Sequence, residues 1–244
     1  MIAEIYHKIS STGSNLTERL EDELTGNYFG NLRYIPFCRG LGKILGNYVK
    51  CNDEEELRHD FLSIDTEEWN TEFWKKSGEG EIDCYMDGIG DIALGIEVKF
   101  YSGLSGKNQL KREARMLQEW SEDHNKKILL FTAPKEADCK RVYGDNKKDV
   151  EDMGVKLCYL TWVDALEGLE KVVTETVFEE LIINDLRELL TLKGFKGFKG
   201  FLIPEKTGKI NETDCWTFNN KEERTFNFRF SIPEIGDETY GFGK

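Results

Sequence analysis

The stretches GEID (residues 80–83) and GIEVKFY (residues 95–101) decide the fold of this chain. Both are strand-like, yet together they carry carboxylates and a lysine among apolar residues. In a β-strand successive side chains point to opposite faces, so Glu97 and Lys99 share one face and their apolar neighbours share the other. The apolar face can pack into a core, which leaves an acid and a base side by side.

The reversal between these two strands determines whether Asp83 can reach Glu97. A two-residue turn at residues 87–88 would leave the two acids about 16 Å apart, at about 3.3 Å per residue. A reversal centred on Gly90, within residues 88–91, places Asp83 directly opposite Glu97, with Cβ atoms about 5 Å apart. We therefore predict the wider loop, which lets both carboxylates share one divalent cation.

Length and composition describe a folded protein. The chain has 244 residues, enough for one large domain or one domain with an appendage, and it is 12% aromatic, so it can build a core. No apolar run approaches the roughly 20 residues that cross a bilayer, and the N-terminus lacks the regions of a secretory signal. The six cysteines are widely spread without zinc-site spacing. These features predict a cytoplasmic protein with reduced thiols and no membrane partner.

The net charge of −13 argues against a general nucleic-acid binder, because polyanions are normally held by clustered Lys and Arg. Two basic clusters depart from this balance: Lys107, Lys111, Arg112 and Arg115, and, near the C-terminus, Lys193, Lys196, Lys199, Lys206 and Lys209. Each is either an ordinary solvated face or a substrate contact. The acidity favours substrate binding in a local groove, or with help from a partner.

The order of the expected elements predicts an α/β fold, with a mixed central sheet flanked by helices. Helices are expected over residues 14–25, 38–50, 108–123, 163–172 and 177–192. Besides the two strands above, strands are expected over residues 61–65, 127–132 and 155–162, with a turn over 69–74 and a loop plus short helix over 134–153. Gly26 is expected to end the first helix, and Leu181 to point inward from the last.

Residues 1–192 are predicted to form this domain and residues 193–244 a small C-terminal extension rich in aromatic residues and Lys. The extension begins with a Gly-Phe-Lys repeat over residues 194–201. Later aromatic residues alternate like those of short strands. The repeat either offers aromatic and basic groups to a single nucleic-acid strand or forms a turn before a strand that packs on the body.

Asp83, the sequence Glu97-Val-Lys99 and the following Gln109 resemble the motifs of the PD-(D/E)XK nuclease superfamily. The acidic run at residues 21–25 resembles the N-terminal helix of that fold, which often contributes another acid. The likeness spans roughly residues 14–165 and lies in short motifs and their order. Two departures are an isoleucine where the motif name has proline, and the acidic net charge.

The resemblance implies a restriction-endonuclease-like core and a Mg²⁺ or Mn²⁺ cofactor. Asp83, Glu97 and the main-chain carbonyl of Val98 would bind the metal, since hard cations prefer oxygen ligands. Glu21 would bind it directly or through water, with Glu18 as the fallback.

Other residues receive roles from the same resemblance. Lys99 would hold or polarise the attacking water and stabilise the phosphorane. Gln109 would orient Lys99 or contact a phosphate, and Tyr101 would line the substrate cleft. The expected substrate contacts also include Lys107, Lys111 and Arg112.

The implied function is a metal-dependent endonuclease, a hydrolase with DNA as the favoured substrate and RNA as the open alternative, in restriction or anti-phage defence. A homodimer is expected if it cuts both strands. The alternative is a catalytically inactive nuclease-fold subunit for binding or assembly with protein partners. The bland interpretation of Glu97 and Lys99 is an exposed ion pair worth about 0.2–1 kcal/mol. The corresponding interpretation of Glu21 and Gln109 is that they lie on solvent-exposed helix faces and have no role in a site.

Overall fold

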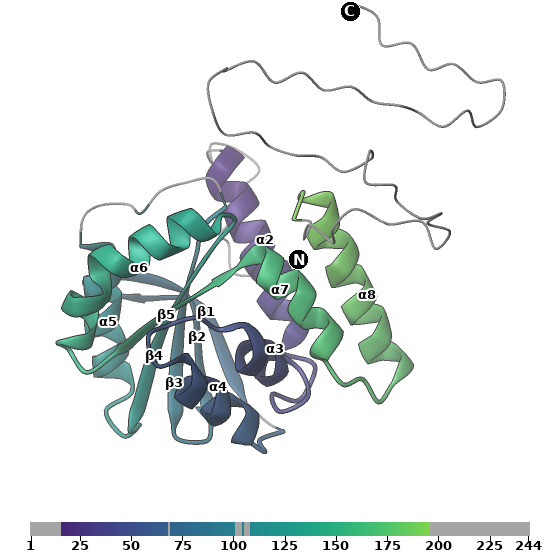
Figure 1. Ribbon diagram of the computed structural model, residues 1–244, viewed down its shortest axis with the longest axis horizontal. Helices are drawn as coiled ribbons and strands as arrows, with labels where there is room; N and C mark the ends of the chain where they lie inside the picture. The colour runs from purple at the N-terminus through teal and green to yellow at the C-terminus, as the bar shows by residue number, and fades with distance from the viewer. Residues whose placement is uncertain (1–15, 68, 101–103, 105–107, 196–244) are drawn as a thin grey trace, which may run out of the picture. The chain divides into compact units, whose positions relative to one another are not determined.

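A computed structural model describes residues 16–67, 69–100, 104 and 108–195, with side chains from residue 20 onward. Within this part of the chain the strands form one five-stranded mixed sheet in the order β1-β2-β3-β4-β5 (Figure 1). The strands are β1 (Asn70–Ser77), β2 (Gly80–Ile89), β3 (Ile92–Val98), β4 (Lys126–Ala133) and β5 (Lys156–Thr161). The first three are antiparallel and the last three are parallel. The α/β fold with a mixed sheet is therefore confirmed.

Helices cover both faces of this sheet (Figure 1). They are α2 (Leu16–Leu32), α3 (Leu41–Tyr48), α4 (Glu54–Ser63), α5 (Gln109–Trp120), α6 (Glu136–Glu151), α7 (Trp162–Gly168), the short 3₁₀ helix η1 (Leu169–Lys171) and α8 (Val177–Leu192). Residues of α5 and α6 pack on one face, and residues of α2, α3, α4, α7 and α8 pack on the other. Every residue of β3 is buried, as expected for the central strand of a sheet covered on both sides.

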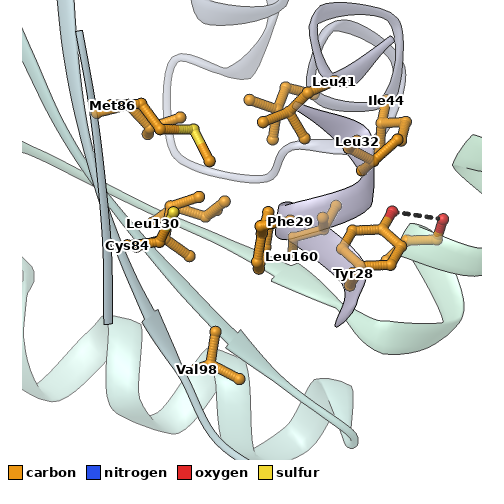
Figure 2. Packing of buried hydrophobic residues seen from close by; sticks show 14 of the residues in the cluster. Tyr28, Phe29, Leu32, Leu41, Ile44, Cys84, Met86, Val98, Leu130 and Leu160 are labelled. Atoms are coloured by element: carbon orange, nitrogen blue, oxygen red, sulfur yellow. Dashed lines mark hydrogen bonds between the residues drawn. The ribbon is translucent and has the colours of Figure 1, made fainter. Parts of the chain in front are cut away.

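The larger core lies between the sheet and α2 (Figure 2). Tyr28 and Phe29 are fully buried there, and the Tyr28 hydroxyl donates a hydrogen bond of 3.1 Å to the carbonyl of Ala165 in α7. This packing explains one wrong prediction, because α2 does not end at Gly26 but continues to Leu32. A helical glycine costs about 1 kcal/mol, and burying one large side chain returns about 1.5–3 kcal/mol.

The predicted register of the β2–β3 hairpin is confirmed, but the wide loop is wrong. Cys84 pairs with Ile96 and Met86 with Leu94, so the same register brings Asp83 opposite Glu97. The reversal itself is tight, because Ile89 pairs with Ile92 across only two residues. The register shifts by one residue between these pairs, where residues 87–88 of β2 face a single residue of β3. This is a β-bulge, and its Gly88 has φ +74°, a conformation that favours glycine.

Four further predictions of local structure are wrong. Residues 61–63, expected in a strand, are the last turn of α4, and residues 70–74, expected in a turn, belong to β1. α6 is a sixteen-residue helix where a loop with a short helix was expected. Leu181 points outward from α8 and is 56% exposed.

The chain divides by its contacts into two units, Met1–Phe198 and Lys199–Lys244, and the described residues all lie in the first. At its end Phe195 is buried, with its ring 5.8 Å from that of Trp162 and 5.6 Å from that of Phe100. The Gly-Phe-Lys repeat, apart from its first two residues, and the later aromatic residues lie outside the described part of the chain, so the extension stays a prediction. In the described part, no helix is both long and apolar enough to span a membrane.

Candidate active site

Lys99 directly follows β3 and is held between two acids. Its Nζ lies 2.6 Å from Oε1 of Glu97 and 2.8 Å from Oε1 of Glu21, and its side chain is only 10% exposed. The main chain is fixed as well: the Lys99 N–H donates to the carbonyl of Thr132 at 2.7 Å, and the indole of Trp162 donates to the Lys99 carbonyl at 3.1 Å. The buried ion pair replaces the exposed pair of the bland interpretation.

Glu21 reaches the site from α2. Besides its contact with Lys99, its Oε2 accepts a hydrogen bond of 3.0 Å from the N–H of Phe100. The acidic helix thus places the carboxylate of Glu21 against the lysine, and its predicted role as a metal ligand, direct or through water, stays a prediction. The side chain of Glu18, the fallback, lies outside the described residues.

Asp83 reaches the same strand end from β2. Its Oδ2 accepts a hydrogen bond of 2.9 Å from the N–H of Val98, and the residue is half-buried. Ile82 and Tyr85 both pack on the α5 side, so the strict alternation of β2 breaks at Asp83. The backbone pairing of the two strands next to the site is that of Cys84 with Ile96, one residue before Asp83, and the Asp83 carboxylate takes the place of the next backbone acceptor for Val98. The backbone pairing of β2 and β3 therefore ends at Asp83, whose carboxylate lies between the two strands.

The neighbouring strand β1 has a strained backbone residue opposite Asp83. In the β1–β2 register, Phe73 pairs with Cys84 and Lys75 with Ile82, so Trp74 lies opposite Asp83. Trp74 has φ +48°, and it is the single non-glycine residue with positive φ among those described. A bulky residue in this conformation costs about 1–2 kcal/mol, and such outliers cluster at functional sites.

The α5 helix supplies the amide of Gln109, a predicted site residue, and the carboxylate of Glu113, which sequence reasoning missed. Gln109 Nε2 donates a hydrogen bond of 2.5 Å to Oε1 of Glu97, the oxygen that also contacts Lys99. The role predicted for Gln109, orienting Lys99 or contacting a phosphate, stays a prediction. Glu113, one turn later, is 2% exposed beside Glu97. The spacing of four residues places Gln109 and Glu113 on one helix face, next to the buried stripe with Leu110 and Ala114. This spacing is the sequence feature that could have identified Glu113 as a site residue.

Burial shifts the pKa values of these groups. It raises the pKa of Glu97 well above its usual range, and the nearby Glu113 carboxylate raises it further. Burial likewise raises the pKa of Asp83, with a further contribution from Glu97, and raises that of Glu113 to about 7. Burial alone would lower the pKa of Lys99, but the surrounding carboxylates, Glu97 first, raise it on balance. Four acids therefore surround one cationic side chain.

The donor set suits a hard divalent cation. Asp83 and Glu97 offer carboxylate oxygens, the ligands that Mg²⁺ and Mn²⁺ prefer. The Val98 carbonyl faces the same side of the strand as the N–H bonded to Asp83, since both groups of an extended residue point one way. No three His, Cys, Asp or Glu side chains converge on one point in the described part of the chain. Any cation held there would keep water ligands.

The expected substrate-binding residues are not all brought to the site. Lys111 is partly exposed, with Nζ 3.6 Å from Asp149 of α6, and Arg112 is half-buried on α5. Arg115 pairs with Glu79, its Nε 2.7 Å from Oε2. Tyr101 and Lys107 lie outside the described residues.

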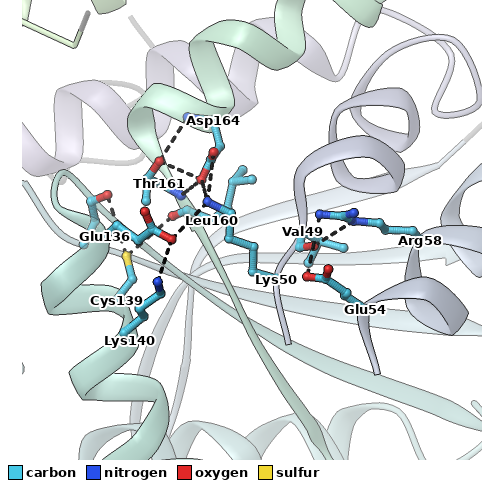
Figure 3. A network of polar contacts seen from close by, with 11 residues as sticks. Val49, Lys50, Glu54, Arg58, Glu136, Cys139, Lys140, Leu160, Thr161 and Asp164 are labelled. Carbon is cyan, nitrogen blue, oxygen red and sulfur yellow. Dashed lines mark hydrogen bonds and ion pairs between the residues drawn. The ribbon is translucent and has the colours of Figure 1, made fainter. Parts of the chain in front are cut away.

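A second charged cluster lies near the carboxyl end of β5 (Figure 3). Lys50 Nζ lies 2.9 Å from Oδ2 of Asp164 and 3.6 Å from Glu136. The Asp164 carboxylate also accepts hydrogen bonds from the N–H and hydroxyl of Thr161, and the Thr161 hydroxyl oxygen accepts one from the Asp164 N–H, which caps α7. Lys140 neutralises Glu136 at 3.1 Å. Acids and donors balance here, as in an ordinary structural network.

Comparisons with known proteins identify no family for this chain. No protein-family model, no curated protein and no solved structure matches this chain.

Proposed function

We propose that this protein is a Mg²⁺- or Mn²⁺-dependent endonuclease of the PD-(D/E)XK kind that hydrolyses phosphodiester bonds. The observation that supports the proposal best is the buried Lys99 between Glu97 and Glu21, with Asp83 at the same strand end. Burying charges costs several kcal/mol per ion, so a fold seldom retains such a cluster for stability alone. DNA is the proposed substrate, with RNA as the alternative.

Asp83, Glu97 and the Val98 carbonyl would hold the cation. A bound divalent cation would lower the pKa of a coordinated water and offset negative charge on the phosphate. Burial, and then repulsion from a neighbouring carboxylate, raises the pKa values of the two acids. A bound cation would offset both effects by stabilising the ionised forms, which supports this assignment.

The other residues supply a positive charge to the site and hold its side chains in position. Lys99 stays protonated, since its pKa is raised, so its ammonium group can hold an attacking water and stabilise the charge that develops on the phosphate. Glu21 holds that ammonium group in place, and Gln109 holds the Glu97 carboxylate. The side chain of Glu97 is thereby fixed from both sides.

Restriction or anti-phage defence in the cytoplasm is the setting we propose for this activity, with a homodimer where both strands are cut. The net charge of −13 supports one alternative, an inactive nuclease-fold subunit that binds or assembles with protein partners. Such a subunit would need no cation and no ordered lysine.

Cleavage of supercoiled plasmid with Mg²⁺ or Mn²⁺ tests the proposal. Wild type should nick the plasmid, EDTA should stop it, and Asp83→Asn should lower the rate at least about 100-fold. Asp87→Asn is the matched control on the same strand, because Asp87 is half-buried and contacts Asn70 away from the site. If the folded wild type cleaves neither DNA nor RNA, the binding subunit is the better description.

A further inference from the structure

Two free thiols, Cys51 and Cys158, lie where the chain after α3 pairs with the edge strand β5. Lys50 lies beside β5 (Figure 3), where it forms an antiparallel bridge with Tyr159. The Lys50 N–H donates to the Tyr159 carbonyl at 3.0 Å, and the Tyr159 N–H donates back to the Lys50 carbonyl at 2.9 Å. The next pair along this bridge is therefore Cys51 with Cys158.

The register of this bridge suits a disulfide. Because Lys50 and Tyr159 exchange both hydrogen bonds, the pair of cysteines is of the non-hydrogen-bonded kind, whose Cα atoms lie about 4.5 Å apart. Disulfides join Cα atoms that are about 4.4–6.8 Å apart. Cys158 belongs to the larger core and Cys51 packs against the same core, so both side chains face one side of the sheet. A bond between the two sulfur atoms therefore requires no change of register.

The two thiols differ in exposure and in surroundings. Cys51 is half-buried, whereas Cys158 is 1% exposed. Burial raises the pKa of the Cys51 thiol, but the N–H of Asp53 and the ammonium group of Lys156 oppose this shift by stabilising the thiolate. Asp53 and Lys156 also line an open cavity of about 350 Å³. A small oxidant can therefore reach Cys51 first.

We propose that Cys51 and Cys158 form a redox modification site, which a low-molecular-weight disulfide converts into a protein disulfide. The Cys51 thiolate attacks one sulfur of the small disulfide, whose S–S bond breaks, and the leaving thiolate takes up the proton that Cys51 lost. The Cys158 sulfur then attacks the Cys51 sulfur and releases the second small thiol in the same way. The two protein thiols are oxidised, and the small disulfide is reduced to two thiols.

The bond would close the outer edge of β5 covalently. Among the described residues, the bridge between Lys50 and Tyr159 is the only backbone pairing at that edge. The disulfide would tie the segment between α3 and α4 to the sheet. Disulfides of cytoplasmic proteins are mostly transient, so we expect a reversible bond. This inference does not depend on the proposed endonuclease activity.

Incubation of the full-length protein with oxidised glutathione at pH 8.5 tests the proposal. Free thiols are then alkylated, the unreduced chain is digested with trypsin, and mass spectrometry follows peptides 51–58 and 157–171, each of which contains one cysteine. Wild type should give these peptides joined and lighter than their sum by two hydrogen atoms, and dithiothreitol should separate them. Cys38→Ser is the matched control, because Cys38 is also half-buried, and it should keep the joined peptides.

Two further variants test the order of the steps. Cys158→Ser should accumulate glutathione on Cys51, and Cys51→Ser should lose the joined peptides. Circular dichroism confirms that each variant is folded. Wild type in which Cys51 keeps its glutathione, or in which both thiols stay free, overturns the proposal. A bond from Cys51 to any other cysteine overturns it as well.

Discussion

The clusters around Lys99 and Lys50 differ in one decisive respect. Each places a lysine between acids near the carboxyl end of a parallel strand, the edge where α/β sheets bind ligands. Around Lys50 each acid has donors of its own, and the lysine side chain is 24% exposed. Around Lys99 four acids share one cation, and the lysine side chain is 10% exposed.

The difference teaches how to separate a structural network from a site. A structural network saturates its carboxylates with hydrogen-bond donors, as Asp164 shows with Lys50 and Thr161. A cluster that keeps a surplus of acids away from water is unstable by itself, and a missing positive charge would complete it. The surplus of carboxylates, rather than their number, marks the candidate active site.

Removing Lys99 should change the free energy of unfolding more than any other substitution in the two clusters. Lys99→Met leaves Glu21 and Glu97 buried without a cation, so we expect the free energy of unfolding at pH 8 to fall by about 3–5 kcal/mol. Urea denaturation in EDTA measures it. Lys76→Met is the control, since Lys76 is 74% exposed with Nζ 3.4 Å from Glu81, and it should cost under about 0.5 kcal/mol. A loss below about 1 kcal/mol in Lys99→Met would contradict the assigned burial cost.

Removing the charge of Glu113 should act in the opposite direction. The pKa of this acid is about 7 when folded and 4.5 as its ordinary value, so the folded state binds the proton more tightly. Stability should therefore be highest at acidic pH and fall as pH rises from 4.5 to 7. Glu113→Gln removes this fall, and we expect a gain of at most about 3 kcal/mol at pH 8 without metal.

Melting temperatures measured from pH 4.5 to pH 8 in EDTA check this prediction. The gain should be nearly absent at the acidic end. Because burial raises the pKa values of Asp83 and Glu97 as well, the variant should keep part of the wild-type pH dependence. A variant that is less stable than wild type at pH 8 would show that Glu113 has donors after all.

Removing Lys50 should have the smallest effect. Lys50→Met leaves Asp164 with its two hydrogen bonds from Thr161, and Glu136 with Lys140, so we expect a loss of about 1 kcal/mol. Plasmid nicking should be unchanged. A drop in nicking as large as that of Asp83→Asn would show that the second cluster belongs to the site.

Local patterns were enough to predict the central part of the sheet. The alternation through Glu97 and Lys99 predicts β3, and the continuous apolar run over residues 127–132 predicts β4. The apolar stripe of residues 109–120 predicts α5 in the same way. β1 was missed because its burial depends on pairing with β2, which no local pattern reports. The extension of α2 beyond Gly26 depends in the same way on a distant core.

The site shows the same limit. Asp83, Glu97 and Lys99 follow from strand geometry once the register is known, and Glu21 follows from the family resemblance. The contact of Gln109 with Glu97, and the burial of Glu113, depend on how α5 rests on the sheet. A glutamate beside an apolar helix stripe looks like a solvated residue until its neighbours are placed.

The bulge at residues 87–88 has a consequence for insertions and deletions. If the register of the Ile89–Ile92 pair continued along the hairpin, Asp83 would meet Val98, whose side chain lies in the core, instead of Glu97. A change of one residue flips every side chain of a strand to the other face. Surface hairpins usually tolerate length changes. Here a single deletion about 13 Å from Asp83, at about 3.3 Å per residue, would separate the acid from its partner without altering any residue of the site.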